Sequence, residues 1–189
     1  MHARVRSTLY EQLEALPEGL TGEILDGQLY AFPRPSAPHG LAASSLGDEL
    51  VSPFQKGRGG PGGWWIIDEP ELHFILNTEV HVPDLAGWRR ERMPRLPEDQ
   101  RFNVVPDWVC EVLSKSTRSI DREIKMPLYA RFGVAHAWLI DPLARTLEAY
   151  ALDAGEWREI GRFGGDDQVA VPPFDAVTID LAGLWVPSE

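Results

Sequence analysis

The stretch from Pro106 to Pro142, PDWVCEVLSKSTRSIDREIKMPLYARFGVAHAWLIDP, decides the fold because two short apolar runs in it flank a helical pattern. The first run, 108–113, is typical of a strand that is buried on both faces. The second run, 137–140, follows Gly133, which predicts the end of the intervening helix. This stretch therefore predicts a strand, a crossover helix and a second strand.

Glu111 lies inside the first apolar run, where a charged side chain is unexpected. Removing an unpaired carboxylate from water costs several kcal/mol, so a buried Glu normally has a cation, a metal or a raised pKa beside it. The helical pattern that follows brings Lys125 back toward the strand. The predicted unit thus encloses one acid and one base.

A purely structural interpretation of the same residues is also open. Glu111 would then end its strand in solvent, and Asp121 with Lys125 would form an exposed helix pair at i, i+4, worth a few tenths of a kcal/mol. Charged groups in apolar surroundings indicate functional sites only in a statistical sense. These residues alone do not decide between structure and catalysis.

The length of 189 residues predicts one domain, 1–189, with a proper core. No segment approaches the roughly 18 apolar residues of a membrane-spanning helix. The N-terminus has no apolar stretch typical of a secretion signal, and 5–16 has the spacing of a short amphipathic helix. We therefore expect a cytoplasmic protein that does not enter membranes.

The formal net charge of −11 argues against a surface that attracts nucleic acid everywhere. Basic residues nevertheless cluster locally, which predicts a cationic rim on an acidic body. They are Arg89, Arg90, Arg92, Arg95 and Arg101, and then Arg118, Arg122 and Lys125. The single cysteine, Cys110, lies in the apolar strand and is expected to pack as a small hydrophobic side chain.

Local patterns predict further elements on both sides of the central stretch. The dipeptide Asp26-Gly27 between two apolar runs predicts a hairpin with a type I′ turn. The segment 41–54 has the period of an amphipathic helix, and 64–67 and 72–75 are typical of strands. Pro127 predicts a kink or a new helix start near Lys125 and Met126. The segment 89–106 is predicted to be a long loop.

Asp84 is a second acid among apolar residues, and it follows Pro83 directly in the segment 80–88. Its structural interpretation is a turn-forming Asp at the start of a strand. His39 is expected to cap a helix or to be exposed, and His73 and His81 lack partners at metal-ligand spacing. The glycine-rich segment 56–63 lacks the ending of a phosphate-binding loop.

An ordered set of motifs in this chain resembles the Uma-type "putative restriction endonuclease" family of the PD-(D/E)XK nuclease superfamily. The resemblance runs from about Thr21 to Tyr150. The motifs are Glu23-Ile-Leu-Asp-Gly, Pro83-Asp84, Glu111-Val-Leu-Ser-Lys-Ser-Thr, Lys125-Met-Pro-Leu-Tyr-Ala and Gly133-Val followed by Trp138-Leu-Ile-Asp-Pro. Each motif is weak alone, but the ordered set is specific.

The resemblance implies an α/β fold with a restriction-endonuclease-like core: a mixed central β-sheet flanked by helices, with additional β-hairpins and a C-terminal β extension at 151–189. It implies that Asp84 and Glu111 are catalytic metal ligands. Leu113 takes the place of the usual lysine, so Lys125 on the following helix is implied as the catalytic lysine. Glu23 is implied to join this cluster.

Carboxylates that converge on one point repel one another unless a divalent cation neutralises them, and an all-oxygen set suits Mg²⁺, or Mn²⁺, better than zinc. The expected activity is metal-dependent hydrolysis of DNA phosphodiester bonds by an endonuclease. Two alternatives stay open. One is a catalytically inactive relative that acts as a protein-interaction or assembly module, and the other is a nuclease for RNA or unusual DNA structures. A homodimer is expected because a duplex has two strands.

Overall fold

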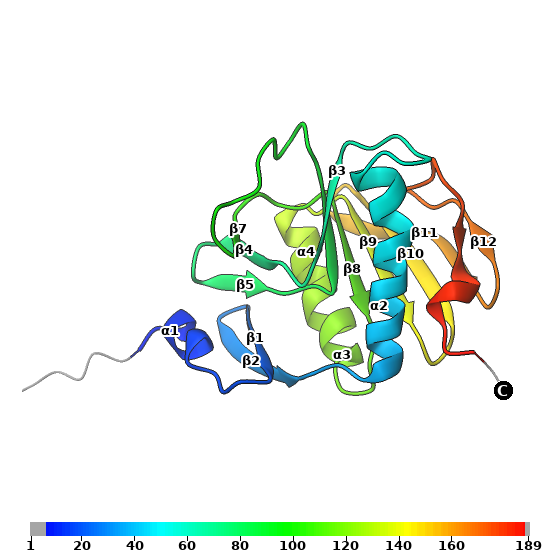
Figure 1. Cartoon of the computed structure of the whole chain (residues 1–189). Helices are drawn as coiled ribbons and strands as arrows, with labels where there is room; N and C mark the ends of the chain where they lie inside the picture. The colour runs from blue at the N-terminus through cyan, green and yellow to red at the C-terminus, as the bar shows by residue number, and fades with distance from the viewer. Residues whose placement is uncertain (1–6, 188–189) are drawn as a thin grey trace, which may run out of the picture.

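A computed structural model describes residues 7–187 of the chain (Figure 1). Its central sheet has six strands in the order β11-β10-β9-β8-β6-β3. They are β3 (Trp64–Asp68), β6 (Leu85–Arg89), β8 (Trp108–Val112), β9 (His136–Asp141), β10 (Thr146–Asp153) and β11 (Glu156–Gly164). Only β8 and β9 run parallel, and the other neighbouring pairs are antiparallel. The prediction of a mixed central sheet is confirmed.

The crossover between β8 and β9 is helical, as predicted, but it is not one regular α-helix. It consists of α3 (Arg118–Ile120), a π-helical turn η2 (Asp121–Lys125) and α4 (Met126–Phe132). Pro127 has no N–H to donate to the carbonyl four residues earlier, which accounts for a new helix beginning beside it. Gly133 ends α4 in the left-handed conformation at φ 80°.

Strand β8 is buried along its whole length because a helix covers each face of the central sheet. Cys110 and Val112 pack with the apolar side of α2 (Ala37–Leu50), while Val109 and Ala137 pack with Tyr129 of α4. This burial on both faces explains the continuous apolar run in the sequence. Figure 1 shows α2 and α4 flanking β8 and β9.

The C-terminal segment covers the same side of the sheet as α2. It contains β12 (Gln168–Val169), β13 (Ile179–Asp180) and the 3₁₀ turn η3 (Leu181–Leu184). Phe174 lies within 4.8–5.6 Å, between ring centroids, of Phe54, Trp64, Trp108 and Trp138. The predicted β extension is therefore part of the domain: the segment after β11 packs into the aromatic core beside α2.

A second sheet lies beside the first and has the order β2-β1-β5-β4-β7. Its strands are β1 (Leu20–Leu25), β2 (Gln28–Pro33), β4 (Glu71–Ile75), β5 (Glu79–His81) and β7 (Arg101–Phe102). The predicted type I′ hairpin is confirmed, because Asp26 and Gly27 have φ angles of 47° and 76° between paired strands. The strands at 64–68 and 71–75 follow each other in sequence but belong to different sheets.

The first helix, α1, spans Leu9–Glu14 and is shorter than the 5–16 pattern predicts. Thr8 caps it by accepting a hydrogen bond from the backbone N–H of Glu11, which fixes the start of the helix. Val5, where the prediction began, lies outside the described residues. Across 7–187, every helix is too short or too polar to cross a bilayer.

Candidate active site

Asp84 lies directly before β6, opposite the end of β8 that carries Glu111. The register pairs Leu85 with Cys110, which places the residues that precede Leu85 and follow Cys110 side by side. Asp84 Oδ2 accepts a hydrogen bond of 2.7 Å from the backbone N–H of Val112. The two acids predicted as metal ligands therefore lie side by side, one near the end of β8 and the other directly before β6.

Glu111 points toward the crossover, where it meets Lys125. Lys125 Nζ lies 2.8 Å from Glu111 Oε1 and 2.9 Å from Glu23 Oε1. It also donates a hydrogen bond of 3.3 Å to the carbonyl oxygen of Val82. Lys125 is only 3% exposed, so the alternative of an exposed helix pair is wrong for this residue. The structure brings the four predicted site residues into one cluster.

Tyr129, one helical turn after Lys125, donates its hydroxyl to the carboxylate of Glu111. Burial raises the pKa of Glu111 well above its usual value, although the charge of Lys125 opposes this shift. Burial also tends to lower the pKa of Lys125, but the carboxylates of Glu111 and Glu23 outweigh it and raise that pKa. The ammonium group is therefore protonated across the physiological range.

Asp121 is a buried acid that belongs to the same cluster. It is 4% exposed, and burial raises its pKa to about 6 despite the opposing charge of Lys125. Asp84 and Glu23 contribute to the upward shift by repulsion. Asp121 and Lys125 thus share a face of the crossover, as the i, i+4 spacing predicts, but that face is turned inward.

His39 contradicts the expectation that it caps a helix or is exposed. It is 8% exposed, lies in the first turn of α2, and its Nε2 is 3.2 Å from Asp84 Oδ1. Burial lowers the pKa of His39, but the hydrogen bond and charge of Asp84 outweigh burial and leave it raised. Both oxygens of Asp84 are therefore held, one by His39 and one by the backbone of Val112.

A cavity of about 540 Å³ opens onto this cluster. Glu23, Asp84, Glu111, Asp121 and Lys125 line it. Apolar side chains form much of the remaining wall: Phe32, Pro33, Pro35, Pro38, Val82, Leu113, Pro142 and Leu143. The acids therefore lie in a hollow with an apolar lining.

The predicted cationic rim is not formed by the arginines expected to form it. None of the five arginines between 89 and 101 lines the cavity, and Arg118 and Arg122 do not line it either. Arg92 pairs with Asp107, and Arg101 lies close to Asp99 and Glu14. Clustering of these arginines in sequence therefore does not place them together at the cavity.

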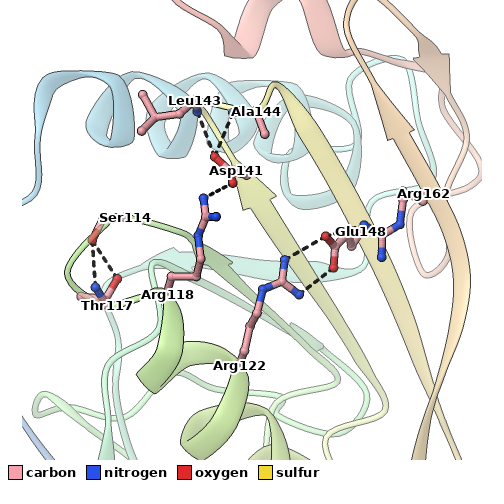
Figure 2. A network of polar contacts seen from close by, with 9 residues as sticks. All are labelled: Ser114, Thr117, Arg118, Arg122, Asp141, Leu143, Ala144, Glu148 and Arg162. Atoms are coloured by element: carbon pink, nitrogen blue, oxygen red, sulfur yellow. Dashed lines mark hydrogen bonds and ion pairs between the residues drawn. The ribbon is translucent and has the colours of Figure 1, made fainter.

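Arg118 and Arg122 instead anchor the crossover to the central sheet, as Figure 2 shows. Arg118 pairs with Asp141 at the end of β9, and Arg122 makes two hydrogen bonds of 2.8 Å to Glu148 on β10. Arg162 on β11 approaches the same carboxylate at 2.9 Å. This network fixes the helical segment that carries Asp121 and Lys125.

The donor set at the cavity suits a hard divalent cation. Glu23, Asp84, Glu111 and Asp121 carry up to four negative charges around one buried lysine. Burial is the main cause of the raised pKa values of Glu111 and Asp121, and repulsion among the acids adds to it. Within 7–187, no three His, Cys, Asp or Glu side chains gather in a metal-holding group. Mg²⁺ commonly uses one or two carboxylates with waters and substrate phosphate, and Asp84 and Glu111 fit that pattern.

Sequence reasoning missed three residues of this site. They are Asp121, Tyr129 and His39. Asp121 and Tyr129 lie four residues before and after the predicted Lys125, a spacing that is the same for an exposed and a buried helix face. His39 carries no comparable signal, because its contact with Asp84 depends on how α2 packs against the sheet. A single histidine at a helix start gives no indication of such a partner.

Comparisons with known proteins identify the family of this chain. The model of the Uma2 family, described as "Putative restriction endonuclease", matches residues 8–182, which is wider than the expected 21–150 and includes most of the C-terminal segment. A search of curated proteins gave no match. The crystal structure of a "putative nuclease belonging to DUF820" from Anabaena variabilis ATCC 29413 is similar, at 25% identity and a TM-score of 0.71, over 95% of this chain and 97% of that one. The chain therefore belongs to the Uma2 family of nucleases.

Proposed function

We propose that the chain is a metal-dependent endonuclease that hydrolyses DNA phosphodiester bonds in the cavity next to Asp84 and Glu111. The observation that carries this proposal is the meeting of two acids from separate strands beside a buried, protonated lysine. Membership of a nuclease family supports the reaction class. The buried charges are costly for folding, so a catalytic use explains their presence better than stability does.

Each side chain has a role that follows from its surroundings. Asp84 and Glu111 would hold Mg²⁺ or Mn²⁺, which when bound polarises a phosphodiester oxygen and lowers the pKa of a bound water. Lys125 places a fixed positive charge at the cavity wall, where it offsets the negative charge that develops on the phosphoryl oxygens. Glu23 makes a second ion pair with Lys125, and His39 holds Asp84.

A cleavage assay on circular DNA tests this proposal, because a circle has no ends and reports only internal cuts. The purified chain is incubated with Mg²⁺ and with either single-stranded or duplex circles. We expect cuts that disappear in EDTA and in Glu111→Gln. Glu156→Gln is the matched control, since Glu156 is an exposed acid of β11 away from the cavity.

If the chain is instead an inactive interaction module, the cleavage assay should give the opposite result. This alternative requires no cleavage of either circle at any Mg²⁺ or Mn²⁺ concentration, with the Glu111→Gln chain indistinguishable from wild type. Equal residual cutting by wild type and Glu111→Gln would point to a contaminating nuclease and would contradict the proposal. The expected homodimer stays a prediction, which sedimentation of the purified chain tests.

A further inference from the structure

The mouth of the cavity carries an aromatic surface on the hairpin strand β2. Phe32 lines the cavity, and its ring lies nearly parallel to that of Tyr30, with 5° between the ring planes and 6.3 Å between centroids. Both side chains are half-buried, so each keeps part of its ring accessible. Residues two apart on a strand share a face, which places this aromatic surface at the entrance to the acid cluster.

Two cations at the same entrance are free to bind an anion. Arg34 and Lys115 line the cavity and are exposed. Unlike Arg118 and Arg122, which pair with Asp141 and Glu148, neither of them has an ion-pair or hydrogen-bond partner for its side chain in the described part of the chain. They provide the available positive charge around a cavity whose base is acidic.

We propose that the DNA strand cut here is unpaired, and that it binds with one base stacked on Phe32 and its phosphates against Arg34 and Lys115. This inference rests on the proposed function of the same cavity. In a duplex, neighbouring bases cover the faces of each base, so an aromatic ring can stack only on a base that has left the helix. Stacking on aromatic side chains beside a basic groove is how proteins bind single strands without reading their sequence.

The charge distribution favours the same choice of substrate. Sequence-independent duplex binding depends on many phosphate contacts, and a net charge of −11 with two free cations at the site does not supply them. The apolar walls from Pro35, Pro38 and Leu143 suit a base rather than a row of phosphates. A single strand can place one phosphate over the acid cluster while the adjacent base occupies the apolar part of the cavity.

The test measures binding of a labelled single-stranded oligonucleotide and of its duplex, with Ca²⁺ as the ion and salt concentration varied. We expect tighter binding of the single strand, with a slope of log affinity against log salt of about −1.4, since each of two phosphate contacts contributes about −0.7. Phe32→Ala should weaken binding by roughly 5- to 150-fold, the range measured for loss of one base–aromatic stack. Phe32→Tyr, which keeps the ring, should retain binding.

Charge variants complete the test. Arg34→Ala should reduce the magnitude of the salt slope by about 0.7. Arg158→Ala, which removes an exposed arginine of β11 away from the cavity, should leave it unchanged. Equal or tighter binding of the duplex, or single-strand binding that Phe32→Ala does not weaken, would overturn the inference even if DNA circles are cut. Tight, Phe32-dependent binding of the single strand without any cutting would uphold the proposed binding mode and refute the proposed hydrolysis instead.

Discussion

Lys125 Nζ lies 2.8 Å from Glu111 Oε1, and both residues are only 3% exposed. A buried ion pair seldom stabilises a fold relative to apolar side chains of the same size, because removing two charges from water offsets their attraction. Breaking such a pair is costly, however, since it leaves one charge unpaired. This asymmetry makes Lys125 the residue whose replacement reports most clearly on the site.

Lys125→Met is expected to lower the free energy of unfolding by about 3–5 kcal/mol at pH 8, because Glu23 and Glu111 would be buried without a cation. The loss should be smaller at pH 5 than at pH 8, because burial raises the pKa of Glu111 and lets this carboxylate take up a proton in the folded variant. Urea denaturation at the two pH values measures the difference. Lys115→Met, at an exposed position, is the control and should change stability little.

Glu148→Gln tests the network that anchors the crossover. Hydrogen bonds from Arg122 depress the pKa of Glu148 from 4.5 to about 2, so the carboxylate stabilises the fold above pH 4.5 and that stabilisation is lost as pH falls toward 2. The variant should be less stable than wild type by about 2 kcal/mol at pH 7, in the range for hydrogen bonds to charged groups. The gap should close in acid. A gap that stays constant from pH 7 to pH 2.5 would show that the contact does not act through charge.

His39→Ala tests whether the histidine positions Asp84. Loss of a partner that orients a metal-binding carboxylate typically reduces activity roughly 10- to 100-fold. His39→Gln, which retains an N–H donor in place of Nε2, should recover part of the lost single-turnover rate. Thermal unfolding of both variants separates positioning from folding. An Ala variant that is as active as wild type, or a Gln variant no better than Ala, would refute a positioning role.

The central strands could be predicted because a strand that is buried on both faces has a continuous run of apolar residues. Residues 108–113 and 137–140 are continuous apolar runs, and their order around a helix with Gly133 at its end gives the topology directly. Asp84 and Glu111 could be found because each is an acid inside an apolar segment, 80–88 and 108–113, and the family resemblance implied their role as metal ligands. Local sequence and local structure agree at these positions.

The remaining features depend on contacts between distant segments. The position of Asp121 was ambiguous because an i, i+4 pair with Lys125 has the same spacing whether its face is exposed or buried. The pairing of Arg118 with Asp141 and of Arg122 with Glu148 brings together residues 23 and 26 positions apart, so the sequence offered only a basic cluster. His39 likewise meets Asp84 only through tertiary packing.

The central claim is that Asp84 and Glu111 share one divalent cation, and calorimetric titration of Mg²⁺ into the purified chain tests it most directly. Mn²⁺ serves as a second titrant, and Glu156→Gln as the control. The account predicts binding of one ion by wild type and by the control, and loss of that binding in both Asp84→Asn and Glu111→Gln. Binding of equal strength in all four proteins would contradict it.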